Sequence, residues 1–169
     1  ALPSAESVRL FDTFLSGVAS LETPCFVISG NHDSPERIAF GASIMSERKV
    51  YMSKVYDGEI NPITLKDAFG EVDVFMLPFI KPAYVRPYIA DAEIDSYQKA
   101  LEHVVASMEI NPMNRNVMVM HQFITAIGSD AERSDSESLS VGGSDNIDVS
   151  VFDVFDYVAL GHLHKPQRV

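Results

Sequence analysis

Three apolar runs of this chain each end in polar residues that include histidine, and this repeated feature limits the folds open to the sequence. Residues 24–29 lead into Gly-Asn-His-Asp, residues 116–120 lead into His121, and residues 157–160 lead into Gly-His-Leu-His. Continuous apolar runs of this length are typical of buried strands. We therefore expect three strands whose ends face a common site instead of the hydrophobic core.

Amphipathic segments alternate with these runs and predict an α/β layered domain. Helices are expected at 4–20, with Ser4 as the N-cap, around 34–44, and at 94–109. The two longer helices each place apolar side chains at helical spacing. The other strands are expected at 48–52, 59–64 and 71–77, with a short helix at 149–155 and the last strand at 156–160. The proline-rich segment 77–89 and the acidic segment 126–146 are expected to be loops.

Composition narrows the classes of function. The chain has 169 residues, enough for one domain, and no apolar run of the length that crosses a bilayer. Its single cysteine, Cys25, leaves no internal disulfide and predicts a cytoplasmic protein. A net charge of −11 counts against a free-standing DNA-binding module. It is compatible with a metal-dependent phosphodiesterase, because bound cations reverse the local charge.

The polar strand ends have the chemistry of a metal site. In open α/β sheets the strand ends converge on one crevice where ligands bind. Imidazole nitrogens and an amide oxygen are donors that suit manganese, iron or zinc. A single histidine at a strand end is usually structural, and His103, within a helix, keeps that interpretation. Gly30 and Gly161 are expected to allow a sharp turn and the close approach of a ligand.

The order of these motifs resembles a known superfamily. Gly-Asn-His-Asp, then an isolated strand-end histidine, then Gly-His-x-His is the order in calcineurin-like metallophosphoesterases. The longer words GNHDSPER, LPFIKPAYVRPYI, SVGG and FDYVALGHLHKPQ are similar to those of the SbcD-type nuclease subunits of SMC-associated nuclease complexes. The resemblance covers almost the whole chain. It implies an α/β/β/α sandwich with mixed sheets.

The resemblance also implies roles for individual residues. His32 would protonate the leaving oxygen, Asp33 would orient the His32 ring, and Arg133 would border the site and bind substrate. The cofactors implied are two divalent ions, usually Mn²⁺. The residues implied as their ligands are Asn31, His121 and His162 for one ion and His164 for the second.

Two motifs of the superfamily, Asp-x-His and Gly-Asp-x-x-Asp, are not found in residues 1–169. Two explanations stay open, a truncated nuclease domain and a natural variant without catalysis. We expect the first: a partial domain that lacks its first two strands and stops before the C-terminal cap domain. Such a chain should bind metal poorly and have little activity alone. It should also expose an apolar face that favours self-association.

The resemblance implies a metal-dependent exonuclease and endonuclease that acts in DNA end processing and repair. The expected partners are DNA, an SMC-like coiled-coil ATPase of the SbcC type and, in the full-length protein, a second copy, with no membrane. The alternatives are a small-molecule phosphodiesterase of the same superfamily and a non-catalytic protein-binding scaffold.

Overall fold

The expected strands and helices form a mixed α/β arrangement in a computed structural model that describes residues 3–90, 93–125, 146–166 and 168–169. In chain order its helices and strands are α1 (Ala5–Ser20), β1 (Cys25–Val27), α2 (Pro35–Ile38), α3 (Ala42–Ser46), β2 (Val50–Met52), β3 (Ile63–Asp67), β4 (Gly70–Leu77), α4 (Pro82–Val85), η1 (Arg86–Tyr88), α5 (Tyr97–Ala106), β5 (Arg115–Met120), β6 (Ile124–Thr125), β7 (Ile147–Asp148), η3 (Val149–Phe152) and β8 (Tyr157–Leu160).

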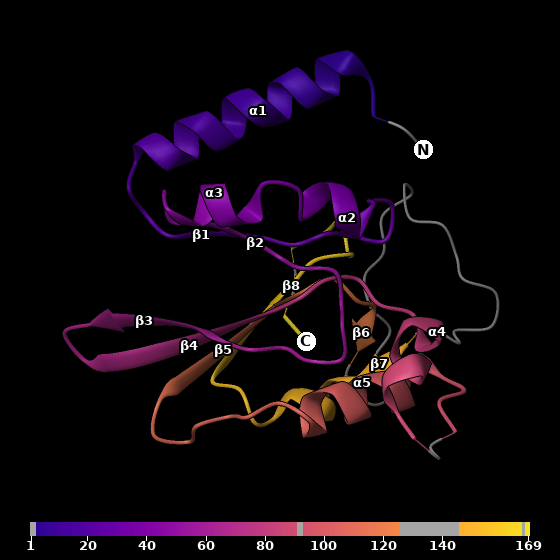
Figure 1. The fold of residues 1–169 in the computed structure, drawn as a ribbon. Coiled ribbons are helices and arrows are strands. Elements are labelled where there is room, and N and C mark those ends of the chain that lie inside the picture. The colour runs from indigo at the N-terminus through magenta and orange to yellow at the C-terminus, as the bar shows by residue number, and fades with distance from the viewer. Residues whose placement is uncertain (1–2, 91–92, 126–145, 167) are drawn as a thin grey trace.

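The described strands pair into three sheets. The largest has the order β3-β4-β5-β8, in which β3 and β4 are antiparallel and the other pairs are parallel. β1 and β2 form a parallel pair, as do β6 and β7. Figure 1 shows α1, α2 and α3 on the side of the β1-β2 pair, and α4 and α5 on the far side of the larger sheet. The prediction of an α/β fold with mixed sheets is therefore confirmed.

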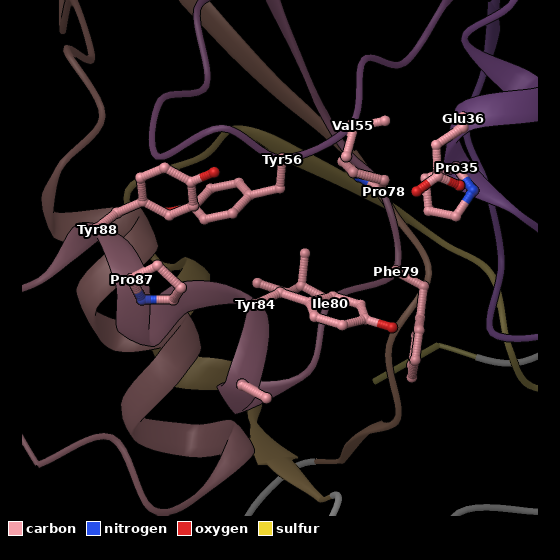
Figure 2. Close-up of a pocket in the computed structure, with 11 residues that line it drawn as sticks. Pro35, Glu36, Val55, Tyr56, Pro78, Phe79, Ile80, Tyr84, Pro87 and Tyr88 are labelled. Carbon is pink, nitrogen blue, oxygen red and sulfur yellow. The ribbon is translucent and has the colours of Figure 1, made fainter.

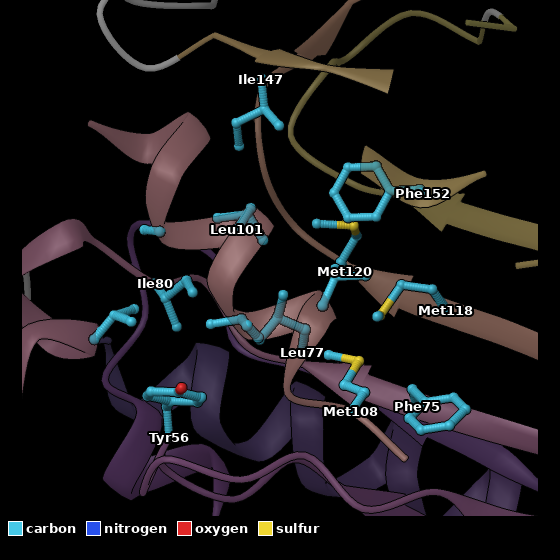
Figure 3. Close-up of a cluster of buried hydrophobic side chains, with 14 of the residues drawn as sticks. Tyr56, Phe75, Leu77, Ile80, Leu101, Met108, Met118, Met120, Ile147 and Phe152 are labelled. Carbon is cyan, nitrogen blue, oxygen red and sulfur yellow. The ribbon is translucent and has the colours of Figure 1, made fainter. Parts of the chain in front are cut away.

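The core lies between the larger sheet and α5. β5 alternates, so that Asn116, Met118 and Met120 are buried while their neighbours are half-buried. The last five residues of β4 are all buried. Figure 3 shows side chains of β4 and β5 gathered with Leu101 of α5 in one apolar cluster. The helix expected at 94–109 is shorter, Tyr97–Ala106, but its predicted apolar face is confirmed: Leu101, Val104 and Val105 join this cluster, as does Met108 just after the helix.

Helix α1 differs from α5 in its burial. Its predicted bounds and N-cap are confirmed, since the Ser4 hydroxyl accepts a hydrogen bond from the Ser7 backbone N–H at 3.1 Å. None of its residues is buried, however, and Leu10 is 71% exposed and Phe14 56% exposed. Of the apolar residues at helical spacing, Leu15 and Val18 are half-buried while Val8 and Phe11 are exposed, so the described residues cover this face of α1 only in part.

Several expected bounds change in the structure. The helix expected around 34–44 is two short helices, because Gly41 adopts φ 75° between α2 and α3. The strand expected at 59–64 begins only at Ile63. Residues 77–89 are not wholly a loop, since Pro82 and Pro87 occupy first-turn positions of α4 and η1, where a missing N–H costs little. The loop prediction for 126–146 falls almost entirely outside the described residues.

Within the described ranges, every helix is too short or too polar to cross a lipid bilayer.

Candidate metal and phosphoester site

The structure brings the three polar strand ends together. Asn31 lies in the turn after β1, His121 follows β5 and His162 follows β8. Asn31 Oδ1 is 3.1 Å from His121 Nε2. The His121 and His162 rings are 5.3 Å apart between centroids and nearly perpendicular, at 88°. An amide oxygen and two imidazoles thus converge from segments far apart in the sequence.

Backbone contacts hold the ends of the strands in this arrangement. β5 and β8 are parallel neighbours, and the Gly161 N–H donates to the Met120 carbonyl at 2.9 Å, one residue before His121. Beyond β1, the Phe79 N–H donates to the Ser29 carbonyl at 2.9 Å, which ties the end of β1 to the end of β4. The site therefore depends on the register of parallel strands.

Two glycines leave space for the ring of His121. A Cβ added at Gly161 would lie 2.6 Å from His121 Nδ1, and one added at Gly30 would lie 3.0 Å from His121 Cε1. Real Cβ atoms essentially never approach to the first of these distances. We expected close approach at both glycines, and the group that the structure places against them is the imidazole of His121.

His162 has a backbone conformation that is uncommon for a residue with a side chain. Its φ is 85°, in the left-handed region that usually favours glycine. Such conformations cost on the order of 1–3 kcal/mol and are concentrated at functional sites. The His162 ring that this turn carries lies nearly perpendicular to the ring of His121.

The carboxylate of Asp33 closes the turn that presents Asn31 and His32. Asp33 Oδ2 accepts a hydrogen bond from the Gly30 N–H at 2.8 Å, and the Asp33 N–H donates to the Gly30 carbonyl at 3.2 Å. Asn31, His32 and Asp33 are all exposed. The partner that the structure gives this carboxylate is backbone, so the orientation of the His32 ring by Asp33 stays a prediction.

The electrostatics of the site favour a neutral imidazole at His121. Burial is the main cause that lowers the pKa of His121 below its usual value, and the nearby His162 lowers it further. Asp33 acts in the opposite direction, while His32 and His164 add small decreases. His121 thus interacts with every other predicted histidine of the site, and a neutral ring is the form that binds metal ions.

The described residues fit one side of a metal site. Asn31, His121 and His162 supply neutral oxygen and nitrogen donors of the kind that suit Mn²⁺, Fe²⁺ or Zn²⁺. Across the described ranges, no three side chains of histidine, cysteine, aspartate or glutamate are placed to hold a metal ion. The donor set has the right chemistry but contains no carboxylate that could compensate the charge of two divalent ions.

One pocket, of about 210 Å³, has Gly161, Gln122 and His164 among its lining residues. Two more pockets lie on the Phe79 side of the site. One, of about 190 Å³, is lined by Asn31, Phe79, Lys81, Tyr97, Gln122, Phe123 and His162. The other, of about 320 Å³, has walls of proline and aromatic side chains, including Tyr84, Tyr88 and Pro87 (Figure 2). Phe79 lines both pockets and packs edge-on against His121, with ring centroids 6.3 Å apart.

Motif reasoning missed two residues next to the site. The Gln122 amide is buried and donates to the Ile80 carbonyl at 3.0 Å, and Phe79 contacts the ring of His121. Their positions in the sequence could have identified them, because Phe79 follows β4 just as His121 and Gln122 follow β5. His103 lies within α5, and Arg133 is outside the described residues.

Comparison with known proteins adds an independent finding. No family model matches the chain. The chain is similar to the SbcD subunit of the nuclease SbcCD from Staphylococcus epidermidis (strain ATCC 12228 / FDA PCI 1200), with 33% identity over 166 residues. The matched region is 97% of this chain and 43% of the Staphylococcus protein. The chain thus spans less than half the length of that relative.

Proposed function

We propose, from the confirmed resemblance of this chain to the SbcD-type nuclease subunits, that it forms part of a metal-dependent DNA nuclease. The observation that carries the proposal is the convergence of Asn31, His121 and His162 at three strand ends. The relative's name, which specifies a nuclease subunit, supports the same activity.

In the proposed reaction, Asn31, His121 and His162 would hold one divalent ion and His164 would contribute to a second, with Mn²⁺ the expected metal. Bound divalent ions supply Lewis-acid polarisation of the scissile phosphate. His32, exposed beside the metal ligands, donates a proton to the leaving oxygen. Asp33 holds the turn that carries His32 through its bond to the Gly30 N–H. Arg133 contacts the substrate.

The proposed fold is the calcineurin-like sandwich, of which residues 1–169 are a partial nuclease domain. The support is the position of the β1-β2 pair between the helices α1 to α3 and the larger sheet (Figure 1). Two further strands carrying Asp-x-His and Gly-Asp-x-x-Asp would extend this layer and provide the missing carboxylates. The chain alone should accordingly bind metal poorly, since it has one side of a two-metal site.

The proposed partners follow from the relative's name and from one exposed surface. The name SbcCD denotes a complex, so we propose that the full protein acts in the cytoplasm with an SMC-like ATPase in DNA end processing and repair. We propose self-association through exposed apolar side chains of α1, of which Leu10 (71% exposed) and Phe14 (56% exposed) lie about one helical turn apart.

The test is hydrolysis of a labelled duplex DNA end in Mn²⁺. The assay compares the 169-residue chain with the same chain joined, at its N-terminus, to a segment that carries Asp-x-His and Gly-Asp-x-x-Asp. The joined protein should cleave and the chain alone should not. In the joined protein, His32→Ala should lower the rate by about 10²- to 10⁴-fold, while the control His103→Ala should not.

Other results would favour the alternatives. Robust cleavage by the 169-residue chain would contradict the proposal that it contains only one side of a two-metal site. Cleavage of a small phosphodiester but not of DNA would indicate the small-molecule phosphodiesterase. The joined protein could also fold and bind a protein partner without binding metal or cleaving DNA. That result would indicate a scaffold. The scaffold is favoured by one observation: in the described ranges, no three His, Cys, Asp or Glu side chains are placed to hold a metal ion.

A further inference from the structure

Lys81 lies in the smaller pocket beside the proposed metal ligands. The residue lines the pocket of about 190 Å³ together with Asn31 and His162. Ile80, the residue before it, is buried in the core, whereas Phe79 and Lys81 both face this pocket. None of the described residues that line the pocket is a carboxylate.

The backbone that carries Lys81 is held in place on both sides. The Phe79 N–H donates to the Ser29 carbonyl at 2.9 Å, and the buried Gln122 amide donates to the Ile80 carbonyl at 3.0 Å. The Tyr84 N–H donates to the carbonyl of Lys81 itself at 2.8 Å, where α4 begins. A flexible cationic side chain is thus attached to an ordered backbone at the edge of the site.

Lys81 has no ion pair with the described residues, whereas Lys99 and Arg115 each pair with an aspartate. Lys99 pairs with Asp95 at 2.8 Å, and Arg115 pairs with Asp67 at 2.7 Å. The Arg86 guanidinium donates to a backbone carbonyl at 2.7 Å. In a chain of net charge −11, an uncommitted ammonium group next to a phosphoester site is complementary to an anionic substrate.

We infer that Lys81 is a substrate-binding residue that contacts a backbone phosphate of the DNA strand next to the scissile one. The inference rests on the proposed function, because it takes the substrate to be a nucleic acid. The contact is electrostatic and carries no base specificity, so it positions the strand whatever its sequence. Its signature is one released counterion per strand bound.

The test measures binding of the 169-residue chain to a fluorescein-labelled oligothymidylate strand by fluorescence anisotropy. EDTA is present so that no cleavage occurs. Affinity is measured from about 50 to 200 mM NaCl for the parent, Lys81→Ala, Lys81→Arg and the control Lys66→Ala. Lys66 is an exposed lysine of β3 in the β3-β4 hairpin, so the control removes the same charge elsewhere. Circular dichroism checks that each variant is folded.

The expected result is a dissociation constant raised roughly threefold or more by Lys81→Ala at low salt, with the slope of log affinity against log salt reduced by about 0.7. Lys81→Arg should keep the parent slope, and Lys66→Ala should leave it unchanged. Equal slopes for Lys81→Ala and the parent, equal losses in both alanine variants, or no DNA binding by the parent would each overturn the inference.

The result is separable from the nuclease test. If Lys81→Ala reduces the salt slope but the joined protein never cleaves DNA, the DNA-binding role of Lys81 is supported and the proposed nuclease activity is contradicted. If the joined protein cleaves DNA but Lys81→Ala leaves the salt slope unchanged, only the inference about Lys81 is contradicted.

Discussion

Helices α1 and α5 have the same pattern of capping and apolar residues in the sequence, but they differ in how much of that apolar surface is buried in the structure. Each begins at a serine N-cap, Ser4 or Ser96, whose hydroxyl accepts the backbone N–H three residues later. Each has apolar residues at helical spacing. Yet α5 buries Ala100, Leu101, Val104 and Val105, and α1 buries none of its residues. Apolar spacing shows which face of a helix seeks a partner, but it does not show whether this chain supplies the partner.

The difference has a physical cause in the neighbours of each helix. α5 packs onto the larger sheet and also contacts α4, β7 and η3, so its apolar face is closed on several sides. α1 contacts β2 of a sheet that has two strands in the described chain. Burying a leucine or phenylalanine contributes about 1.5–3 kcal/mol, which α1 does not gain here.

The largest expected effect is truncation of the fully buried side chain of α5. Leu101→Ala should lower the free energy of unfolding by about 3 kcal/mol, because it removes buried methyl groups and leaves a cavity. The matched control, Leu10→Ala in α1, should change it by less than about 0.5 kcal/mol. Urea denaturation measures both. A Leu10→Ala cost equal to that of Leu101→Ala would show that α1 is packed after all.

Removing the two N-caps should also destabilise the protein more at α5 than at α1, but by less than the Leu101 truncation. Ser96→Ala should cost about 1 kcal/mol, because α5 unfolds together with the core and loses the acceptor for the Lys99 N–H. Ser4→Ala should mainly fray the first turn of α1. Hydrogen exchange can separate the two, with faster exchange expected at Ser7 and little change in the core amides. Global destabilisation by Ser4→Ala would mean that the two helices unfold as one unit.

A charge on the exposed face of α1 should alter association more than stability. Phe14→Glu should change the free energy of unfolding of the monomer by less than about 0.5 kcal/mol, since the side chain is 56% exposed. Sedimentation over a wide concentration range should show that the parent associates and the variant does not. Identical sedimentation of both proteins would contradict the proposed self-association surface.

The smallest effect is expected at the exposed ion pair that begins α5. Lys99→Ala breaks the contact of 2.8 Å with Asp95, and both side chains are about half exposed. Water and salt screen such pairs, so the urea midpoint should not move measurably. A clear shift that disappears at high salt would show that the pair contributes more than its exposure suggests.

Much of the site was predictable from local sequence. A polar cluster after each of three apolar runs identified Asn31, His121 and His162 as groups that should meet, and the structure places them together. What could not be predicted was the close contact of His121 with Gly161, because it depends on the register between β5 and β8. The break between α2 and α3 at Gly41 also went unpredicted, since a single glycine inside an apolar pattern does not by itself end a helix.

Short-range periodicity and capping were enough to predict the class of fold, the bounds of α1 and the residues that lie at the site. Three features could be seen only in the folded molecule: which helix buries its apolar residues, the left-handed backbone of His162, and the position of Lys81 in one pocket with Asn31 and His162. These features depend on how segments distant in the chain pack and pair. Side-chain spacing within one segment carries no information about what a remote segment places against it.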